Sequence, residues 1–224
     1  MIDEGFSHWL AEALTQSVAT ARTASAMHVQ AEEALNVTRQ MREFLTPLLM
    51  RMAKEDSQFL SRYRRSMLTA FVEAAMQVSG ADMGNIQLFD AAASGLRIEA
   101  QRGFSQPFLN YFDCVHDGHA ACGTAFKNRS QVIVEDVVES HVFLHTRALE
   151  VVLDAGVRAV QSTPLVGPSG SVLGIISTHR RKPWRPSSRD LRLLDLLARS
   201  AGEWLETRMH LKSSPESGAS VDQS

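Results

Sequence analysis

The stretch DGHAACGTAFKNRSQVIVEDV, residues 117–137, combines a cysteine beside a glycine, small side chains, a basic patch and an apolar run that ends in acids. This combination fits three kinds of site: a reactive thiol, a loop that cradles phosphate, or the wall of a small-molecule pocket. Within the stretch, Val132 to Val134 are predicted to form a short strand. The helices and strands predicted on either side of the stretch help to decide between these three kinds of site.

The chain around this stretch switches between helical and strand periodicity. Apolar residues of 57–78 recur at helical spacing, and Ser79-Gly80 ends that helix. Residues 86–88 and 96–100 alternate apolar with polar, and the turn-rich DAAASG between them predicts a hairpin. The other predicted elements are a short helix within 105–115, a helix at 148–153, and a second hairpin formed by 158–165 and 172–178.

This order of elements predicts an α+β fold with a mostly antiparallel sheet and helices at both ends. The last helix begins with a capping box, in which Ser187 is the N-cap and Asp190 follows three residues on. Pro164 cannot donate to a strand ladder and is expected at a strand end or a bulge. Residues 212–224 are polar and rich in Gly and Ser, so they are predicted to be a disordered tail.

The first 55 residues are predicted to be a separate helical segment, 1–55, in front of a domain at 57–211. Residues 6–52 contain no glycine, and their one proline, Pro47, should kink the helix. The helix could pack on its own domain or pair with a second copy. Pairing is favoured, because a helix of this length would extend beyond the surface that its own domain can offer for packing. The coiled-coil seam would then consist of Met27, Ala31, Ala34, Thr38, Met41, Leu45, Leu48 and Met52.

Composition indicates a globular protein of a reducing compartment. The net charge of -2 supplies no basic field that would draw the chain to nucleic acid or to a membrane. Two cysteines, Cys114 and Cys122, are too few for a disulfide scaffold. No signal peptide and no membrane-spanning run is recognisable. The expected location is therefore the cytoplasm, with no nucleic-acid or membrane partner.

Five segments together resemble the GAF domain family: GADMGNIQLFD, IEAQRGF, CGTAFKNRSQVIVEDV, VRAVQSTPLVGPSGSVLGIISTH and RPSSRDLRLLDLLARSAGEWLE. They occur in the family's order, over about residues 68–205. The resemblance implies a GAF-like fold, with a central antiparallel sheet, helices on one face and a ligand pocket on the other. It also implies signalling, since such domains occur in sensor kinases, phosphodiesterases and transcription regulators. Fold membership alone does not fix a ligand.

The chain departs from two ligand-binding groups of that family. The Asn-Lys-Phe-Asp-Glu signature of cyclic-nucleotide binders cannot be laid onto this sequence. Bilin binders attach the pigment through a cysteine commonly followed by histidine, whereas Cys122 precedes Gly123 and Cys114 precedes Val115. The cofactor is therefore unknown. The chain shows neither a kinase catalytic region nor a helix-turn-helix, so a separate output protein is expected.

Cys122 has two interpretations. Near a helix start its thiolate would be stabilised, and the sequence around CGTAF…VEDV is similar to that of the free methionine-(R)-sulfoxide reductases of this fold. Those enzymes use additional cysteines, of which Cys114 could stand for the upstream one, but VESHVFLHTRALE lacks the downstream one. Without it the cycle has no attacking thiol. A small buried cysteine beside the pocket is the favoured interpretation.

Two other clusters are assigned to solvent-exposed segments. His116, His119, His141 and His145 fall within 30 residues, but their spacings match no common zinc pattern, so no metal site is predicted. THRRKPWRPSSR places five basic residues around Trp184. Such a pattern can bind phosphates, yet a solvated connector is the commoner case.

The favoured function is a non-enzymatic sensor that binds a small molecule and relays its state through terminal helices, as a homodimer. A reductase-like thiol enzyme and a ligand-free dimerisation or scaffold module are the alternatives. No catalytic residue is predicted. The pocket candidates, by their placement within the family pattern, are Phe108, Phe112, Cys122, Thr124, Phe143, Ser162 and Thr178.

Overall fold

The computed structural model describes residue 12, residues 57–116 and residues 118–213. The predicted coiled-coil seam and the residues from 214 onwards lie outside this part of the chain, so they remain predictions. The described elements, in chain order, are α3 (Ser57–Ser79), β1 (Met83–Asp90), β2 (Gly95–Arg102), α4 (Gln106–Tyr111), β3 (Cys114–Val115), α5 (Ala120–Asn128), β4 (Val132–Val134), α6 (Arg147–Asp154), β5 (Ala159–Val166), β6 (Val172–Arg180) and α7 (Ser188–Ser213).

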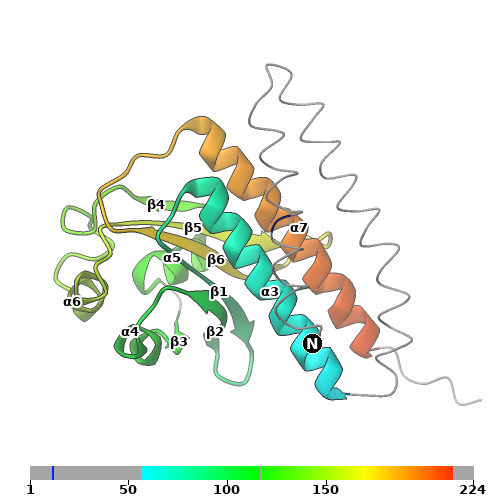
Figure 1. The fold of residues 1–224 in the computed structure, drawn as a ribbon. Helices are drawn as coiled ribbons and strands as arrows, with labels where there is room; N and C mark the ends of the chain where they lie inside the picture. Colours follow the sequence, from blue (N-terminus) through cyan, green and yellow to red (C-terminus); the bar gives the residue numbers. More distant parts are fainter. Residues whose placement is uncertain (1–11, 13–56, 117, 214–224) are drawn as a thin grey trace, which may run out of the picture.

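The six strands form one antiparallel sheet in the order β3-β2-β1-β6-β5-β4. Both predicted hairpins are present, as β1–β2 and β5–β6, and the pairing of β1 with β6 joins them. This pairing places two segments far apart in sequence at the centre of the sheet (Figure 1). The predicted α+β class and the mostly antiparallel sheet are confirmed.

The long helices α3 and α7 cover one face of the sheet and contact each other (Figure 1). Leu68, Phe71 and Val72 of α3 are buried there with Ile86 and Ile176 of the central strands. Trp204 of α7 contacts two aromatic rings of α3, with 6.2 Å between ring centres in each case: those of Tyr63 and Phe71. Burying large aromatic side chains in this way contributes strongly to stability.

The start of α7 has the predicted capping box. The Ser187 Oγ accepts a hydrogen bond from the Asp190 backbone N–H at 3.2 Å, and the Ser187 N–H donates back to Asp190 Oδ2 at 3.0 Å. Further along, a Cβ on Gly202 would come within 2.3 Å of the Val166 carbonyl oxygen, so glycine lets α7 lie directly on β5. The capping box defines where α7 begins, and the close approach at Gly202 sets the distance between α7 and the sheet.

Pro164 lies where its missing N–H is tolerated. It pairs with Ile175 of β6, whereas the ladder between β4 and β5 spans only Val160 to Ser162. The register of β5 shifts just after it, between Leu165 and Val166. The proline therefore lies inside β5, two residues before its end, beyond the ladder with β4 and one residue before the irregularity, rather than at the strand end itself.

The short helices α4, α5 and α6 lie over the other face of the sheet, and β4 forms its edge beside β5 (Figure 1). A second apolar cluster is buried there, including Met83, Phe108, Val134, Phe143 and Val152. Both faces of the central strands are thus covered, so neither face is free for a polar surface. Within the described residues, no helix is both long and apolar enough to cross a bilayer.

Candidate ligand pocket

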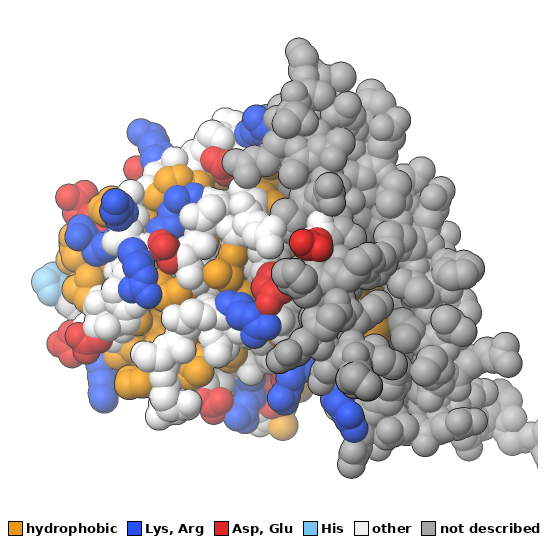
Figure 2. Space-filling model, in the orientation of Figure 1, with side chains coloured by type: hydrophobic (Ala, Val, Ile, Leu, Met, Phe, Trp, Pro, Cys, Tyr) orange, Lys and Arg blue, Asp and Glu red, His pale blue; other side chains and the backbone are white. Residues whose placement is uncertain are grey.

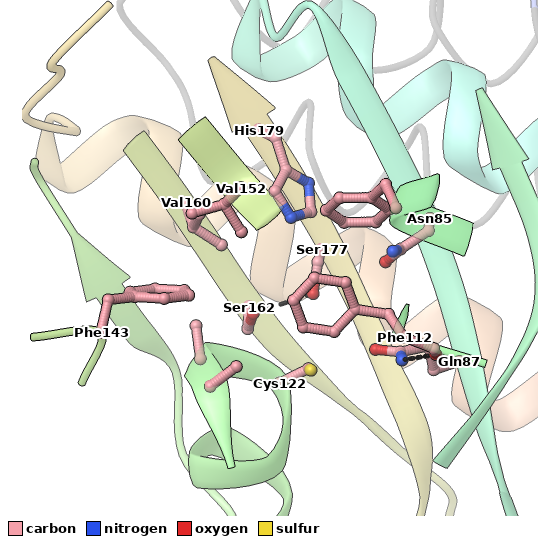
Figure 3. A pocket seen from close by; sticks show the side chains of 13 residues that line it. Asn85, Gln87, Phe112, Cys122, Phe143, Val152, Val160, Ser162, Ser177 and His179 are labelled. Carbon is pink, nitrogen blue, oxygen red and sulfur yellow. Dashed lines mark hydrogen bonds between the residues drawn. The ribbon is translucent and has the colours of Figure 1, made fainter. Parts of the chain in front are cut away.

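A small cavity lies between the sheet and the layer of short helices. Its floor is made by three neighbouring strands, each of which contributes two residues: Asn85 and Gln87 of β1, Ser177 and His179 of β6, and Val160 and Ser162 of β5. Its roof and walls come from Phe108, Phe112, Ala120, Ala121, Cys122, Phe143 and Val152. Figure 3 shows these side chains converging from the two layers.

The roof is mainly aromatic. Phe108 in α4 and Phe112 just after it have ring centres 4.5 Å apart, and Phe104 stacks on Phe108 at 4.0 Å. The cavity volume, measured as the space that the centre of a water molecule can occupy, is about 20 Å³. That is room for one water and no more. A larger occupant therefore requires the aromatic roof to move away from the sheet.

The floor carries a row of polar groups across three strands. Asn85 of β1 is directly opposite Ser177 of β6, and Ser177 is directly opposite Ser162 of β5. The two serine hydroxyls are 2.8 Å apart and hydrogen-bond to each other. The Asn85 Oδ1 is buried and has no hydrogen-bond partner among the described residues. An unsatisfied buried amide oxygen is unfavourable unless something else binds it.

His179 extends this polar floor towards α4. Its ring meets Phe104 edge to face, with 4.9 Å between ring centres, and Phe108 at 5.9 Å. Burial lowers the pKa of His179 to about 3, so the imidazole is neutral at physiological pH. Its Nδ1 is buried without a hydrogen-bond partner in the described part of the chain. The floor thus presents two unsatisfied polar atoms, one on Asn85 and one on His179.

Gln87 and Cys122 close one end of the cavity. The Gln87 Nε2 donates to the Phe112 carbonyl oxygen at 3.4 Å, a long hydrogen bond that joins the floor to the roof. Cys122 is buried in the first turn of α5, and burial raises the pKa of its thiol to about 11. Desolvation therefore outweighs any stabilisation of a thiolate by the helix start. The structure agrees with a packed cysteine beside the pocket.

Five of the seven predicted pocket residues line the cavity: Phe108, Phe112, Cys122, Phe143 and Ser162. Thr124 does not, because it lies further along α5 and its hydroxyl donates to the Ala120 carbonyl oxygen at 2.7 Å. The placement of Thr178 in the pocket is wrong by one residue of strand register. Since Ser177 and His179 face the cavity, Thr178 faces the α3–α7 layer, where its partner Gly84 approaches Val72.

Sequence reasoning missed Asn85, Gln87, Ser177 and His179. Asn85 and Gln87 alternate with Ile86 and Leu88, a pattern typical of a strand with one solvated face. The predicted helices themselves could have revealed them. Helices at both ends of the domain and further helices in its middle are enough to cover both faces of the sheet. A sheet covered on both faces buries the polar half of each central strand as well.

None of the four clustered histidines and none of the five basic residues around Trp184 lines the cavity. No group of three or more His, Cys, Asp or Glu side chains within the described residues is arranged to hold a metal. In the basic connector, Arg180 lies 4.1 Å from the centre of the Trp184 ring and Arg185 pairs with Glu135 at 3.1 Å. On the face seen in Figure 2, basic and acidic side chains are interspersed over the described surface.

Comparison with known proteins agrees with this fold. The family model of the GAF domain matches residues 62–206, which is more than half of the chain. The chain therefore belongs to the GAF domain family, a class of domain typical of sensory signalling proteins. Among curated proteins, none matches the sequence.

Several solved structures share the fold. One is a domain of a putative two-component sensor histidine kinase from Sinorhizobium meliloti 1021, with 22% identity and a TM-score of 0.55 over 66% of this chain and 96% of that one. Another is the free methionine-R-sulfoxide reductase of Neisseria meningitidis, solved with its substrate, with 16% identity and a TM-score of 0.54 over 66% and 80% of the two chains. A third is the GAF domain of an Acinetobacter phosphoenolpyruvate-protein phosphotransferase, with 14% identity and a TM-score of 0.54 over 66% and 84%. At these identities the likeness concerns the fold alone.

Proposed function

We propose that this protein is a non-enzymatic sensor in which a small molecule binds between the sheet and the aromatic roof. The observation that carries the proposal is the pair of buried, unsatisfied polar atoms, Asn85 Oδ1 and His179 Nδ1, beside an otherwise aromatic and aliphatic cavity. Apolar walls with a few placed polar groups are the usual make-up of a small-molecule site. A bound molecule that pairs with these atoms would remove their desolvation penalty.

The end of β6 offers a route from the pocket to the long helices. His179 faces the cavity, and the next residue, Arg180, points to the opposite layer, where its guanidinium donates to the Ser79 carbonyl oxygen at the end of α3. The same guanidinium lies over Trp184, four residues before α7 begins. A ligand that moves His179 therefore acts on the attachment of both helices, and shifts their population between two arrangements.

The proposal includes a cytoplasmic homodimer that acts on a separate output protein. Dimerisation would use the heptad seam from Met27 to Met52, whose Ala and Thr positions make it weak enough to shift register. Light scattering of the wild type and of a Met41→Glu/Leu45→Glu variant tests this part. Charges in the seam should convert a dimer to a monomer, and a wild-type monomer at tens of micromolar rules the dimer out.

A thermal-shift screen of the full chain against neutral and charged metabolites, followed by native mass spectrometry of the hits, tests the sensor. Binding should raise the melting temperature, because a ligand that binds only the folded state stabilises it. Turnover of free methionine sulfoxide with a thiol reductant would contradict the non-enzymatic assignment. The raised pKa of the Cys122 thiol argues against such turnover, since the thiolate is the nucleophile.

A ligand-free dimerisation or scaffold module is the second candidate. One observation favours it: the cavity that Phe108, Phe112 and Phe143 help to line is only about 20 Å³. For this candidate the two unsatisfied atoms would be met by a single trapped water. A complete screen with no stabilising compound and no bound mass would select it over the sensor.

A further inference from the structure

The lining of the cavity restricts what it can bind. Every residue of the floor and of the roof is uncharged: three phenylalanines, small aliphatic residues, Cys122, two serines, two amides and the neutral His179. An ionised ligand would leave water for a site without a compensating charge, and burying an unpaired charge is strongly unfavourable. A carboxylate, phosphate or ammonium group is therefore disfavoured inside the cavity.

The polar atoms of the floor define an edge. Asn85 supplies a carboxamide whose Oδ1 is free to accept, and the neighbouring Ser177–Ser162 pair shares one hydrogen between two hydroxyls, which leaves the other hydrogen free to donate. Because Asn85 and Ser177 are direct partners across β1 and β6, acceptor and donor lie next to each other on the sheet. An amide edge, with an N–H beside a C=O, matches this pair; carboxamides recognise such edges by two hydrogen bonds in other settings.

The roof selects for shape. Phe104 and Phe108 stack with 11° between their planes, and Phe112 follows with its ring tilted by 39° to Phe108 and 4.5 Å between the ring centres. A flat ring can slide beneath such a series and gain offset stacking, whereas a bulky saturated ring meets it edge-on. The roof is the wall that must lift for anything larger than water, and lifting it breaks the hydrogen bond from Gln87 to the Phe112 carbonyl oxygen.

We infer that the pocket takes a small, uncharged, planar molecule with an amide or lactam edge, whose edge is bound by Asn85 and the Ser162–Ser177 pair and whose ring packs against Phe108 of α4 and Phe112 just after it. This inference rests on the proposed sensor function and names the chemical class of its ligand. It concerns a neutral heteroaromatic amide, and so excludes phosphorylated nucleotides and carboxylate-bearing pigments from this cavity.

Matched probes separate charge from shape. Nicotinamide and 2-pyridone represent the class; nicotinate has the ring of the first with a carboxylate, and cyclohexanecarboxamide has the amide on a saturated ring. Binding to the full chain is measured by ligand-detected NMR at millimolar probe, then by calorimetry. At least one of the planar amides should bind, with both nicotinate and cyclohexanecarboxamide at least about ten-fold weaker, because nicotinate brings an uncompensated charge and cyclohexanecarboxamide cannot stack.

Two variants locate the contact. Asn85→Leu should abolish binding of the planar amide. Thr178→Val is the matched control, because Thr178 adjoins Ser177 on the same strand but faces α3 and α7, so this variant should bind as the wild type does. Circular dichroism melting checks that both variants fold; if Asn85→Leu does not, Ser177→Ala replaces it and should weaken binding at least about ten-fold through the lost hydroxyl.

The outcomes distinguish this inference from the proposed function. If nicotinate or the saturated amide binds as tightly as the planar amides, the ligand class is wrong while the sensor pocket stands. If binding survives both Asn85→Leu and Ser177→Ala, the assigned edge is wrong. If none of the four probes binds and the broader thermal-shift screen finds no compound, both the ligand class and the sensor are wrong, and the scaffold candidate replaces them.

Discussion

The guanidinium of Arg180 lies 4.1 Å from the centre of the Trp184 ring and donates a hydrogen bond to the backbone carbonyl of Ser79, at the last residue of α3. The three residues come from the end of β6, the connector to α7 and the end of α3. A cation stacked on an indole and bonded to a carbonyl holds these segments together more tightly than an exposed ion pair would.

Replacing Arg180 should therefore weaken the attachment of the helical layer. Arg180→Met keeps much of the apolar stem but removes the cation and the donor, and should lower the free energy of unfolding by about 1–2 kcal/mol. Lys182→Met, at an exposed position of the same connector, is the control and should change stability by less than about 0.5 kcal/mol. Urea denaturation measures both, and equal effects would refute the role of the Arg180 contact.

The Ser162–Ser177 hydrogen bond predicts an asymmetric pair of mutations. Ser177→Ala leaves the fully buried Ser162 hydroxyl without its partner, and should cost about 1–3 kcal/mol of stability. The double variant Ser162→Ala/Ser177→Ala removes both groups, and should be closer to the wild type than the single variant is. A double variant that is less stable than either single variant would show that the hydroxyls do not act as a pair.

Stability should fall in mildly acidic solution because of His179. Its pKa is about 3 in the folded protein and about 6.5 in an unfolded chain, so the unfolded state binds the extra proton between these values. The free energy of unfolding should then drop by about 1.4 kcal/mol per pH unit as the pH falls below about 6.5, from this group alone.

The measurement compares urea denaturation at pH 7 and pH 5. His179→Gln cannot take up the proton and should flatten this pH dependence, whereas His141→Gln, at an exposed position, should retain it. The Arg158 guanidinium beside Asp136 lowers the pKa of that carboxyl below its usual value, so its contribution is lost only at more acidic pH. An unchanged slope in His179→Gln would contradict a neutral buried imidazole.

The two cysteines should differ in reactivity towards a thiol reagent. Cys114 is partly exposed on β3, whereas Cys122 is buried and its thiol has a pKa of about 11. At pH 8 the native protein should therefore be labelled once by iodoacetamide, at Cys114, and Cys114→Ser should not be labelled until denaturant is added. Peptide mass spectrometry assigns the modified residue. Rapid labelling of Cys122 in the native protein would reopen the reductase-like interpretation.

The sequence by itself determined the elements and the family. Ser187 and Asp190 cap α7 through atoms three residues apart, and the alternation around Ile86 and Leu96 defines the first hairpin; both signals are local, so they can be read without knowing what packs on what. The resemblance to the family, which is carried by short local motifs, also placed Phe108, Phe112 and Cys122 near a pocket.

Only the tertiary structure decided which polar residues face the cavity. Asn85 and Ser177 come together because β1 pairs with β6, across some ninety residues of chain, and no local pattern encodes that register. Thr178 was misplaced for the same reason: side chains alternate along a strand, so an error of one residue exchanges the two faces. In a sheet buried on both sides, polarity does not tell the faces apart, and the choice rests on the layer that packs against each.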